Sequence, residues 1–358
     1  MRKTHDVHVR SLTPLPPPRE YAEKLPLSDS VANHVSRSRE QIRNILDGND
    51  DRLLVMVGPC SIHDERAAIE YTERLAELSR RVSDRIMVAM RVYFEKPRTT
   101  LGWKGLINDP YLDGSFDISA GMYKAREILL KVNELRMPAA TEFLDPFTPQ
   151  YIADLVSWAA IGARTTESQT HRQMASGLSM PVGFKNGTGG TVQIAVDAIV
   201  SAGSPHGFLG IDHDGRACVV NTTGNPHRHL ILRGGAMGPN YDANSVAAAS
   251  GLLAASGMPP HVMIDCSHAN CNKDHARQPI VFRDVLRQRV EGNGNIIGIM
   301  LESHLFEGNQ KLGDDPSELK YGVSITDPCV SWETTEELLL EAHESLAGSV
   351  GARAGAAD

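Results

Sequence analysis

Short apolar runs and longer amphipathic windows alternate along this chain from residue 52 onward. Short runs rich in β-branched residues are typical of buried strands, whereas apolar residues three or four positions apart are typical of helices. We expect strands at residues 53–58, 86–90, 139–144, 159–163, 181–184, 230–232, 262–264 and 296–301. We expect helices at residues 65–82, 119–135, 149–158, 167–178, 190–203, 242–256, 274–291 and 334–347.

Eight strands that are each followed by a helix indicate an α/β protein of the (β/α)8 TIM-barrel type. An open doubly wound sheet is the alternative, but no GxGxxG fingerprint follows the first strand. One segment breaks the alternation, because Asp212-His213-Asp214-Gly215 separates two apolar runs and is typical of a β-hairpin turn. We therefore predict a catalytic barrel over residues 51–350, with a hairpin insert at 206–222 before the sixth barrel strand.

The first fifty residues have a different pattern. The proline-rich stretch 13–18 predicts an extended arm, and residues 30–46 predict a helix that Gly48-Asn49-Asp50 ends. We expect residues 1–50 to form an arm and helix with a regulatory or oligomerisation role. We expect residues 351–358 to form a disordered tail.

The composition narrows the class of protein. The 358 residues include 36 basic and 44 acidic side chains, and the net charge of −8 argues against a nucleic-acid partner. No run approaches the ~18 apolar residues of a membrane span, and residues 1–10 do not resemble a secretory signal. An odd number of cysteines favours reduced thiols in a cytoplasmic protein. These five cysteines are Cys60, Cys218, Cys266, Cys271 and Cys329.

Residues with reactive side chains lie at the ends of the expected strands. In a barrel of this type, catalytic groups come from the carboxyl ends of the strands. A polar residue at any one strand end is ordinary, but a rim made only of charged groups, an imidazole and a thiol is not. In chain order these residues are Cys60, Arg91, Glu142, Arg164, Lys185, Arg233, His268 and Glu302.

Four of these strand-end residues are cations, and two more cations, Lys96 and Arg98, lie in the loop after the second strand. Bringing many like charges together is unfavourable unless an anion compensates them. Arginine suits two-point contacts with carboxylate or phosphate, and lysine supplies a compact charge. A phosphorylated carboxylic acid is a substrate that matches this set.

Cys60, His268, Glu302 and the later Asp327 form a mixed set of soft and hard ligands. Such a set suits Mn²⁺, Fe²⁺, Co²⁺ or Zn²⁺ with an open coordination position, rather than a closed structural zinc site. A single cysteine such as Cys60 is more often a small buried residue, and a single histidine such as His268 is more often structural. A metal site and a purely structural role therefore both stay open at this point.

The same residues occur in long motifs that resemble those of class I 3-deoxy-D-arabino-heptulosonate 7-phosphate (DAHP) synthases of the microbial, feedback-regulated type. The resemblance covers nearly the whole chain. Lys96-Pro97-Arg98-Thr99 also separates it from the related synthase of the eight-carbon sugar acid of lipopolysaccharide. The motifs are Gly58-Pro59-Cys60-Ser61-Ile62-His63, Arg91-Val92-Tyr93-Phe94-Glu95-Lys96-Pro97-Arg98-Thr99-Thr100, Gly162-Ala163-Arg164-Thr165-Thr166-Glu167-Ser168, Gly183-Phe184-Lys185-Asn186-Gly187-Thr188 and Ser267-His268-Ala269-Asn270.

The resemblance implies a metal-dependent transferase that condenses phosphoenolpyruvate with D-erythrose 4-phosphate and releases phosphate, the first step of the shikimate pathway. It implies one divalent metal per subunit, bound by Cys60, His268, Glu302 and Asp327, and catalytic roles for Cys60, Lys96, Glu142 and His268. Glu142 would position a water, and we suggest Lys96 as the proton donor to the alkoxide. Phosphoenolpyruvate would contact Arg91, Lys96, Gly162, Ala163, Arg164, Lys185 and Arg233. Erythrose 4-phosphate would contact Lys96, Pro97, Arg98 and Thr99.

The resemblance also implies feedback inhibition by an aromatic amino acid and a homodimer or homotetramer. Gly210 favours tyrosine, because a missing side chain leaves room for the phenol hydroxyl, whereas Thr326-Asp327-Pro328-Cys329 resembles tryptophan-sensitive relatives. The effector positions carried over are Asp6 from a neighbouring subunit, Pro149, Gln150, Leu178, Ser179, Phe208, Gly210 and Val220.

One departure from the family pattern is the loop Ala236-Met237-Gly238, which is one residue longer and lacks the usual lysine. We also expect Cys60 and Cys329 to form a disulfide readily in metal-free protein, because Asp327 brings Cys329 close to the metal site. Two alternatives remain open. One is an inactive relative that only senses aromatic amino acids or binds a partner, and the other is a different metal-dependent aldolase-like barrel acting on a phosphosugar.

Overall fold

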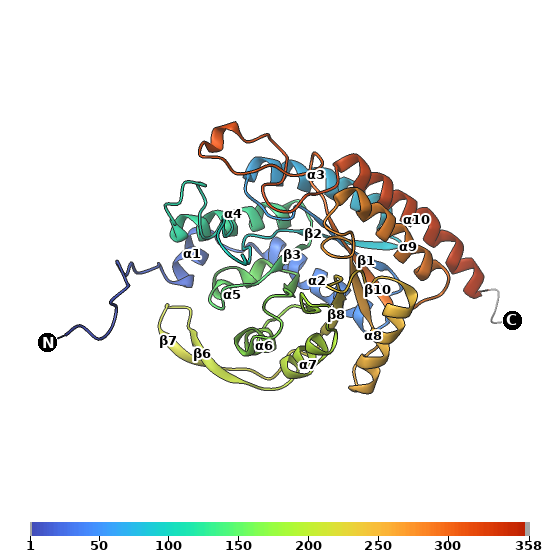
Figure 1. Ribbon diagram of the computed structural model, residues 1–358, viewed down its shortest axis with the longest axis horizontal. Coiled ribbons are helices and arrows are strands. Elements are labelled where there is room, and N and C mark those ends of the chain that lie inside the picture. Colours follow the sequence, from blue (N-terminus) through green and yellow to red (C-terminus); the bar gives the residue numbers. More distant parts are fainter. Residues whose placement is uncertain (1, 355–358) are drawn as a thin grey trace.

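The computed structural model describes residues 2–354, and the side chains of the last helix as far as residue 347. Its core is a closed barrel of eight parallel strands, in the spatial order β1-β10-β9-β8-β5-β4-β3-β2 (Figure 1). This confirms the TIM barrel expected from the sequence. The barrel strands are β1 (Leu53–Gly58), β2 (Ile86–Arg91), β3 (Ala139–Glu142), β4 (Trp158–Ile161), β5 (Val182–Lys185), β8 (Arg228–Leu232), β9 (Val262–Asp265) and β10 (Ile296–Glu302).

Helices cover the outside of the barrel, and several begin at a side-chain cap that satisfies a free backbone amide of the first turn. Asp64 accepts from the amide of Ala67 at the start of α3, and Asp242 accepts from Ser245 at the start of α8. The helices are α1 (Pro18–Lys24), α2 (Asp29–Leu46), α3 (Glu65–Val82), α4 (Ile118–Glu134), α5 (Thr148–Ile152), α6 (Gln169–Ser176), α7 (Gln193–Ala202), α8 (Ala243–Ala255), α9 (Gln278–Val290) and α10 (Trp332–Ala354). In the described part of the chain, none of them has the length and apolar character needed to cross a bilayer.

The hairpin insert is present where the sequence predicts it. Strands β6 (Gly207–Ile211) and β7 (Ala217–Asn221) pair antiparallel as a separate two-stranded sheet before β8. Figure 1 shows this hairpin outside the barrel, on the side of α5 and α6. Its turn contacts the start of α1, where the Arg19 side chain donates to Asp214 at 2.7 Å.

One expected helix is wrong, and one helix of the structure was not expected. The predicted helix 149–158 is replaced by α5, a 3₁₀ turn (Ala153–Leu155) and the first residue of β4. Trp158 lies inside the barrel with no exposed surface, as the first residue of β4. The helix α1 was not expected, and Pro18 stands at its first position, where a missing amide costs nothing. The expected tail at 351–358 overlaps the end of α10, and residues 355–358 lie outside the described residues.

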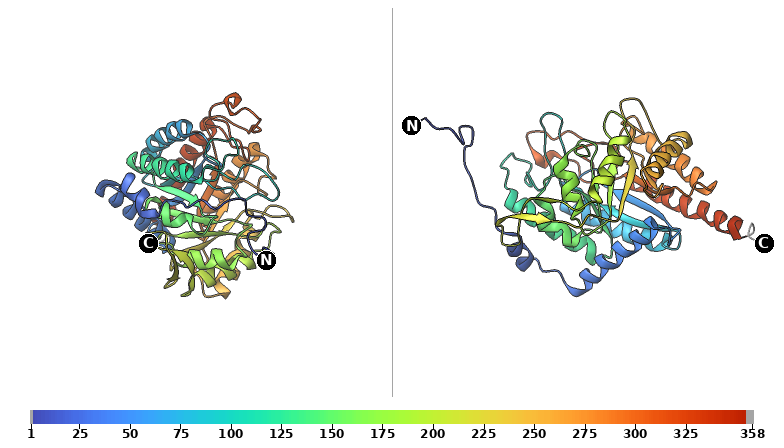
Figure 2. Two further views of the ribbon diagram at one scale, coloured as in Figure 1. Left: turned by 90° about the vertical axis from the view of Figure 1, so that its left-hand side faces the viewer. Right: turned by 90° about the horizontal axis from the view of Figure 1, so that it is seen from below.

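Helix α2 closes one end of the barrel. Its apolar residues Ile42, Ile45 and Leu46 pack against Leu54 of β1 and Met87 of β2, near the amino ends of these strands. In the right-hand view of Figure 2, the blue helix α2 lies beneath the strands. Because this end of the barrel is plugged, the carboxyl ends of the strands form the open end.

Candidate active site

The strand ends surround one cavity at the open end of the barrel. The structure therefore brings together most of the residues that the sequence indicates, although they come from distant parts of the chain. Thr188, in the loop after β5, also lines the cavity and was not expected to do so, whereas Thr99 lies on an exposed loop and is absent from the lining. The lining consists of Lys96, Pro97, Arg98, Glu142, Gly162, Ala163, Arg164, Lys185, Thr188, Arg233, His268 and Asp327.

Three of the four expected metal ligands form a tight group beside this cavity. Donor atoms of Cys60, Glu302 and Asp327 lie within 4.8 Å of one another. His268 is outside this group, but its Nε2 atom is 3.9 Å from Oε1 of Glu302. The group has the chemistry of a divalent-cation site, since it combines a thiol with two carboxylates.

The charges around Cys60 favour a cation at this place. Burial raises the pKa of the Cys60 thiol to about 11, and the Glu302 carboxylate adds to the effect. A positive charge nearby is needed to bring the thiol toward its anionic, metal-binding form. In the structure Nζ of Lys96 lies 3.1 Å from the Cys60 sulfur and 3.0 Å from its carbonyl oxygen.

Glu302 at the end of β10 is fully buried and receives several donors. Arg91 pairs with its Oε1 atom at 3.0 Å, and the Ser267 hydroxyl donates to its Oε2 atom at 2.6 Å. Burial alone would raise the pKa of Glu302, but the positive charges of His268, Arg91 and Lys96 lower it to about 2. Glu302 is therefore a carboxylate at neutral pH.

Arg91 has unused hydrogen-bonding capacity although it is 1% exposed. Its guanidinium stacks over the ring of Tyr93 at 4.0 Å, and one nitrogen pairs with Glu302. Its Nε and Nη1 atoms are buried and have no partner among the described residues. Buried donors without an acceptor cost free energy, so a bound anion would supply the acceptors that these two nitrogens lack.

Asp265 is a central residue of the site that the sequence analysis missed. Its Oδ2 atom lies 2.9 Å from both Nζ of Lys185 and Nδ1 of His268, and the residue has no exposed surface. Burial alone would raise the pKa of Asp265, but Lys185 and His268 hold it well below its usual value. A carboxylate directly after the apolar run 262–264 is the signal that could have found it.

The backbone of His268 supports this arrangement. Its φ angle is +59°, in the left-handed region that residues other than glycine rarely adopt. With Nδ1 turned to Asp265, its Nε2 atom is left on the side of Glu302. A histidine oriented by a carboxylate in this way is typical of metal-ligating imidazoles.

Three asparagines connect the ends of β5, β8 and β9. Oδ1 of Asn186 accepts from the amide of Arg233 at 2.9 Å, and Asn240 donates to the same oxygen at 3.2 Å. Asn240 in turn accepts from the Gly234 amide and donates its own amide to Asn270. The network therefore fixes the backbone that carries Arg233, and the sequence analysis did not assign it a role.

Seven of the eight expected effector residues lie in three places on the hairpin side of the barrel. Phe208 and Val220 are paired across the hairpin, while Pro149 and Gln150 lie in α5. Leu178 and Ser179 follow α6, whose last residue is tied to the end of the hairpin by a 2.6 Å hydrogen bond between Ser176 and Thr222. Asp6 lies in the exposed arm, and none of the contacts of the described residues joins it to these positions. Gly210 stands opposite Cys218 on the hairpin.

A barrel with a cationic mouth beside a thiol and carboxylate group is the architecture of an aldolase-like enzyme that acts on phosphorylated acids. Residues 29–340 match the model of the DAHP synthetase I family, and the chain belongs to this family. The resemblance stated from the sequence motifs is confirmed, and the protein is an enzyme.

Known relatives match over almost their full length. The chain is 52% identical to the Tyr-sensitive phospho-2-dehydro-3-deoxyheptonate aldolase of Escherichia coli K12 over 349 residues, which is 98% of each chain. It is 54% identical to the Phe-sensitive enzyme of the same strain over 350 residues, again 98% of each chain. It is 52% identical to the Trp-sensitive enzyme of that strain, over 99% of this chain and 100% of the relative. The sequence identities therefore do not indicate whether tyrosine, phenylalanine or tryptophan inhibits this enzyme.

A solved structure shows the same fold. The phospho-2-dehydro-3-deoxyheptonate aldolase from Francisella tularensis SCHU S4 superposes with a TM-score of 0.92 and is 47% identical. The match covers 94% of this chain and 98% of that chain.

Proposed function

We propose that this protein is a DAHP synthase, which condenses phosphoenolpyruvate with D-erythrose 4-phosphate to DAHP and phosphate. The reaction is the first step of the shikimate pathway to the aromatic amino acids. The observation that carries the proposal is one cavity lined by Lys96, Arg164, Lys185 and Arg233 directly beside the Cys60, Glu302 and Asp327 group. Family membership over residues 29–340 supports it.

The cations of the mouth bind the two phosphorylated substrates. Arg164, Lys185 and Arg233 take the phosphate and carboxylate of phosphoenolpyruvate, with Arg91 donating from its unpaired nitrogens. Gly162 lets the Glu142 carboxylate lie against the backbone, since a Cβ atom there would lie 2.3 Å from Oε1 of Glu142. The aldose phosphate is assigned to the loop of Lys96, Pro97, Arg98 and Thr99.

One divalent cation, Mn²⁺, Fe²⁺, Co²⁺ or Zn²⁺, would be held by Cys60, Glu302, Asp327 and Nε2 of His268. When bound it supplies Lewis acidity toward the aldehyde oxygen of the aldose. Asp265 holds the His268 ring in the orientation that this binding needs.

The protein's own groups then act on the two substrates in sequence. C3 of phosphoenolpyruvate attacks the aldehyde carbon, and Lys96 donates a proton to the alkoxide that forms. Water held by Glu142 adds to the positive centre at C2, and one of its protons replaces the proton that Lys96 gave up. The resulting hemiketal phosphate loses phosphate by cleavage of the C–O bond, and its hydroxyl proton leaves with the phosphate. Burial opposes the charge of Lys96, but Cys60, Glu302 and Asp327 raise its pKa and keep it protonated.

The test is phosphate release from phosphoenolpyruvate, measured with erythrose 4-phosphate and then with other phosphorylated aldoses. We expect phosphate release with erythrose 4-phosphate. We expect a chelator to abolish this activity and one of the four metals to restore it. Release only with another phosphosugar would establish the alternative aldolase. Inactivity with every metal, together with binding of an aromatic amino acid, would establish an inactive sensor.

We propose in addition that residues 1–50 act as a regulatory and oligomerisation segment of a homodimer or homotetramer. Asp6 would then complete the effector site of a neighbouring subunit, and tyrosine would be the inhibitor because position 210 is glycine. The assay is repeated with tyrosine, phenylalanine and tryptophan, and stronger inhibition by either of the last two would contradict the choice of tyrosine. All five cysteines are free, which is consistent with the cytoplasmic location that we propose.

A further inference from the structure

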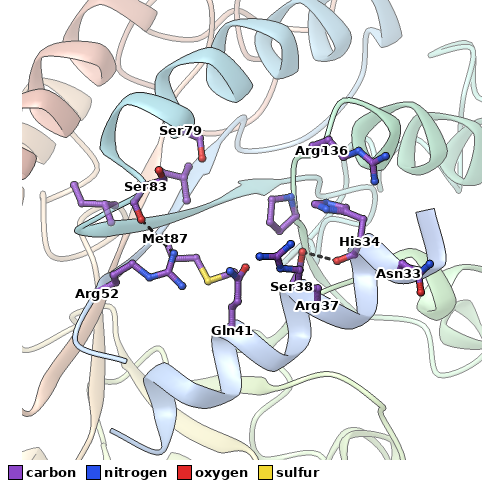
Figure 3. Close-up of a pocket in the computed structure, with 13 residues that line it drawn as sticks. Asn33, His34, Arg37, Ser38, Gln41, Arg52, Ser79, Ser83, Met87 and Arg136 are labelled. Atoms are coloured by element: carbon purple, nitrogen blue, oxygen red, sulfur yellow. Dashed lines mark hydrogen bonds between the residues drawn. The ribbon is translucent and has the colours of Figure 1, made fainter. Parts of the chain in front are cut away.

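A second cavity lies at the closed end of the barrel, away from the catalytic mouth. It has a volume of about 460 Å³ and lies between α2, the end of α3, the start of β2 and the segment before β3. Figure 3 shows side chains of α2, among them Arg37 and Gln41, projecting toward it, with Arg52 on the other side. This volume is within the range of ~300–1,000 Å³ that is typical of small-molecule sites.

The lining of this cavity carries positive charge and contains no aspartate or glutamate. Arg52 is neutralised by Asp50, which it contacts at 2.6 Å. Arg136 donates only to the hydroxyl and carbonyl oxygens of Ser30, so its charge is not neutralised by an ion pair to a described residue. The side chain of Arg37 makes no hydrogen bond or ion pair with any residue that the structure describes.

The two uncompensated arginines line the same cavity as His34. Burial lowers the pKa of His34, and the charges of Arg136 and Arg37 lower it further. The Nε2 atom of His34 is buried and has no hydrogen-bond partner among the described residues. An anion in this cavity would therefore enter a region of positive potential that the described residues leave uncompensated.

The floor of the cavity is apolar. Ile86 and Met87 at the start of β2 are 1% and 4% exposed, and Pro138 lies beside them. An inorganic anion would leave this surface uncovered, whereas an anion with an apolar body would contact it. The cavity thus combines two guanidinium groups at one side with a hydrophobic floor.

We propose that this cavity is a binding site for a small organic anion. Its carboxylate or phosphate group pairs with Arg37 and Arg136, and its apolar part packs against Met87 and Pro138. The site is separate from the catalytic mouth, because it lies at the first residues of β2 while Arg91 is the last. The proposal does not depend on the reaction that the enzyme catalyses.

The experiment measures binding of benzoate and of phenyl phosphate to the full-length protein by isothermal titration calorimetry. Benzyl alcohol serves as a neutral probe of the same shape. We expect at least one of the two anions to bind more tightly than the alcohol, and the ratio of their affinities distinguishes a carboxylate site from a phosphate site. Binding is also expected to raise the melting temperature, since a ligand of the folded state stabilises it.

Arg37→Ala is the decisive variant, because Arg37 has no partner in the described structure whose loss would affect folding. We expect it to weaken binding about tenfold, the effect of losing one charge-assisted hydrogen bond. Arg277→Ala removes another exposed arginine, far from this cavity in the sequence, and is the matched control. Arg164→Ala disables the catalytic mouth and is expected to leave this binding unchanged.

Three results would overturn the proposal. The first is no binding of either anion, and the second is equal binding by the wild type and Arg37→Ala. The third is loss of binding in Arg164→Ala alone, which would place the probe in the catalytic mouth. If neither anion binds and Arg37→Glu changes the mass in sedimentation, the cavity is part of a subunit contact instead. A crystal structure with the ring on Met87 would confirm the site directly.

Discussion

Asp265 and His268 are in contact through the atoms Oδ2 and Nδ1, at 2.9 Å, on the inner side of the catalytic mouth. This contact leaves Nε2 as the free nitrogen of the imidazole, 3.9 Å from Glu302. The same carboxylate oxygen is 2.9 Å from Lys185. Asp265 therefore couples the orientation of a proposed metal ligand to that of a proposed substrate contact.

We expect Asp265→Asn to weaken metal binding by about 10- to 100-fold, the usual effect of losing a partner of a ligating histidine. Because Lys185 loses its counter-ion, the KM for phosphoenolpyruvate should change as well. Titration of metal-free protein with Mn²⁺ measures the first effect, and steady-state kinetics at saturating metal measures the second. Asp51→Asn changes an exposed carboxylate at the closed end of the barrel and is the control. An unchanged metal affinity would show that Asp265 does not orient His268.

Lys96 is the group that we assign to proton donation, and its Nζ atom already lies within 3.1 Å of the Cys60 sulfur. Lys96→Met is expected to lower turnover by ~10²–10⁴-fold, the contribution of a general acid, while metal content stays intact. Metal analysis and the phosphate-release assay are made on the same sample. Lys104→Met, at an exposed position of the same loop, should keep normal turnover. Near-normal turnover of Lys96→Met would exclude the assigned role.

The sequence predicts most of this site because a barrel brings all its strand ends to one rim. Finding a reactive side chain within a few residues of the end of each apolar run is then enough to identify Cys60, Arg91, Lys185 and Glu302 as neighbours. Two such side chains follow the run 262–264, Asp265 directly and His268 three residues later, and choosing His268 leaves Asp265 without a role. Only the left-handed turn at His268 brings the two side chains together, and residue pattern does not reveal that turn.

Elements with an ambiguous pattern account for the errors in the fold. The segment 149–158 has the pattern of one helix, but it holds the short helix α5, a 3₁₀ turn and Trp158, which is buried inside the barrel as the first residue of β4. The asparagine network escapes prediction for another reason. Asparagine is common in loops, and its role depends on partners from three different strand ends.

Asn240 holds this network together, since it bonds to Gly234, Asn186 and Asn270. We expect Asn240→Ala to loosen the backbone that carries Arg233 and to raise the KM for phosphoenolpyruvate more than it lowers kcat. Steady-state kinetics with each substrate varied separately measures this split. Asn244→Ala, on the exposed first turn of α8, is the matched control. A fall in kcat with unchanged KM values would contradict a role in positioning Arg233.

Cys60 and Cys329 are both free and fully buried in the structure. Burial raises the pKa of Cys329 well above its usual value, and the neighbouring Cys60 thiol contributes to the shift. We expect a Cys60–Cys329 disulfide when metal-free protein is oxidised, and protection from it when metal is bound. Mass mapping of peptides without reduction detects the bond, and Cys218 at the hairpin serves as an internal control. Two free thiols after oxidation of metal-free protein would rule this reaction out.

Gly210 is the residue on which the choice of tyrosine rests. A Cβ atom at this position would lie 2.7 Å from Cγ2 of Val220, so a serine side chain would displace Val220 and narrow the expected effector site. We expect Gly210→Ser to weaken inhibition by tyrosine and to leave inhibition by phenylalanine equal or stronger, because phenylalanine lacks the hydroxyl group. Inhibition curves for both amino acids on the wild type and the variant measure the ratio. Gly207→Ser, on the same strand near Asn221 rather than Val220, controls for general disturbance of the hairpin. If the tyrosine-to-phenylalanine ratio of Gly210→Ser equals that of the wild type, position 210 does not determine which amino acid inhibits the enzyme.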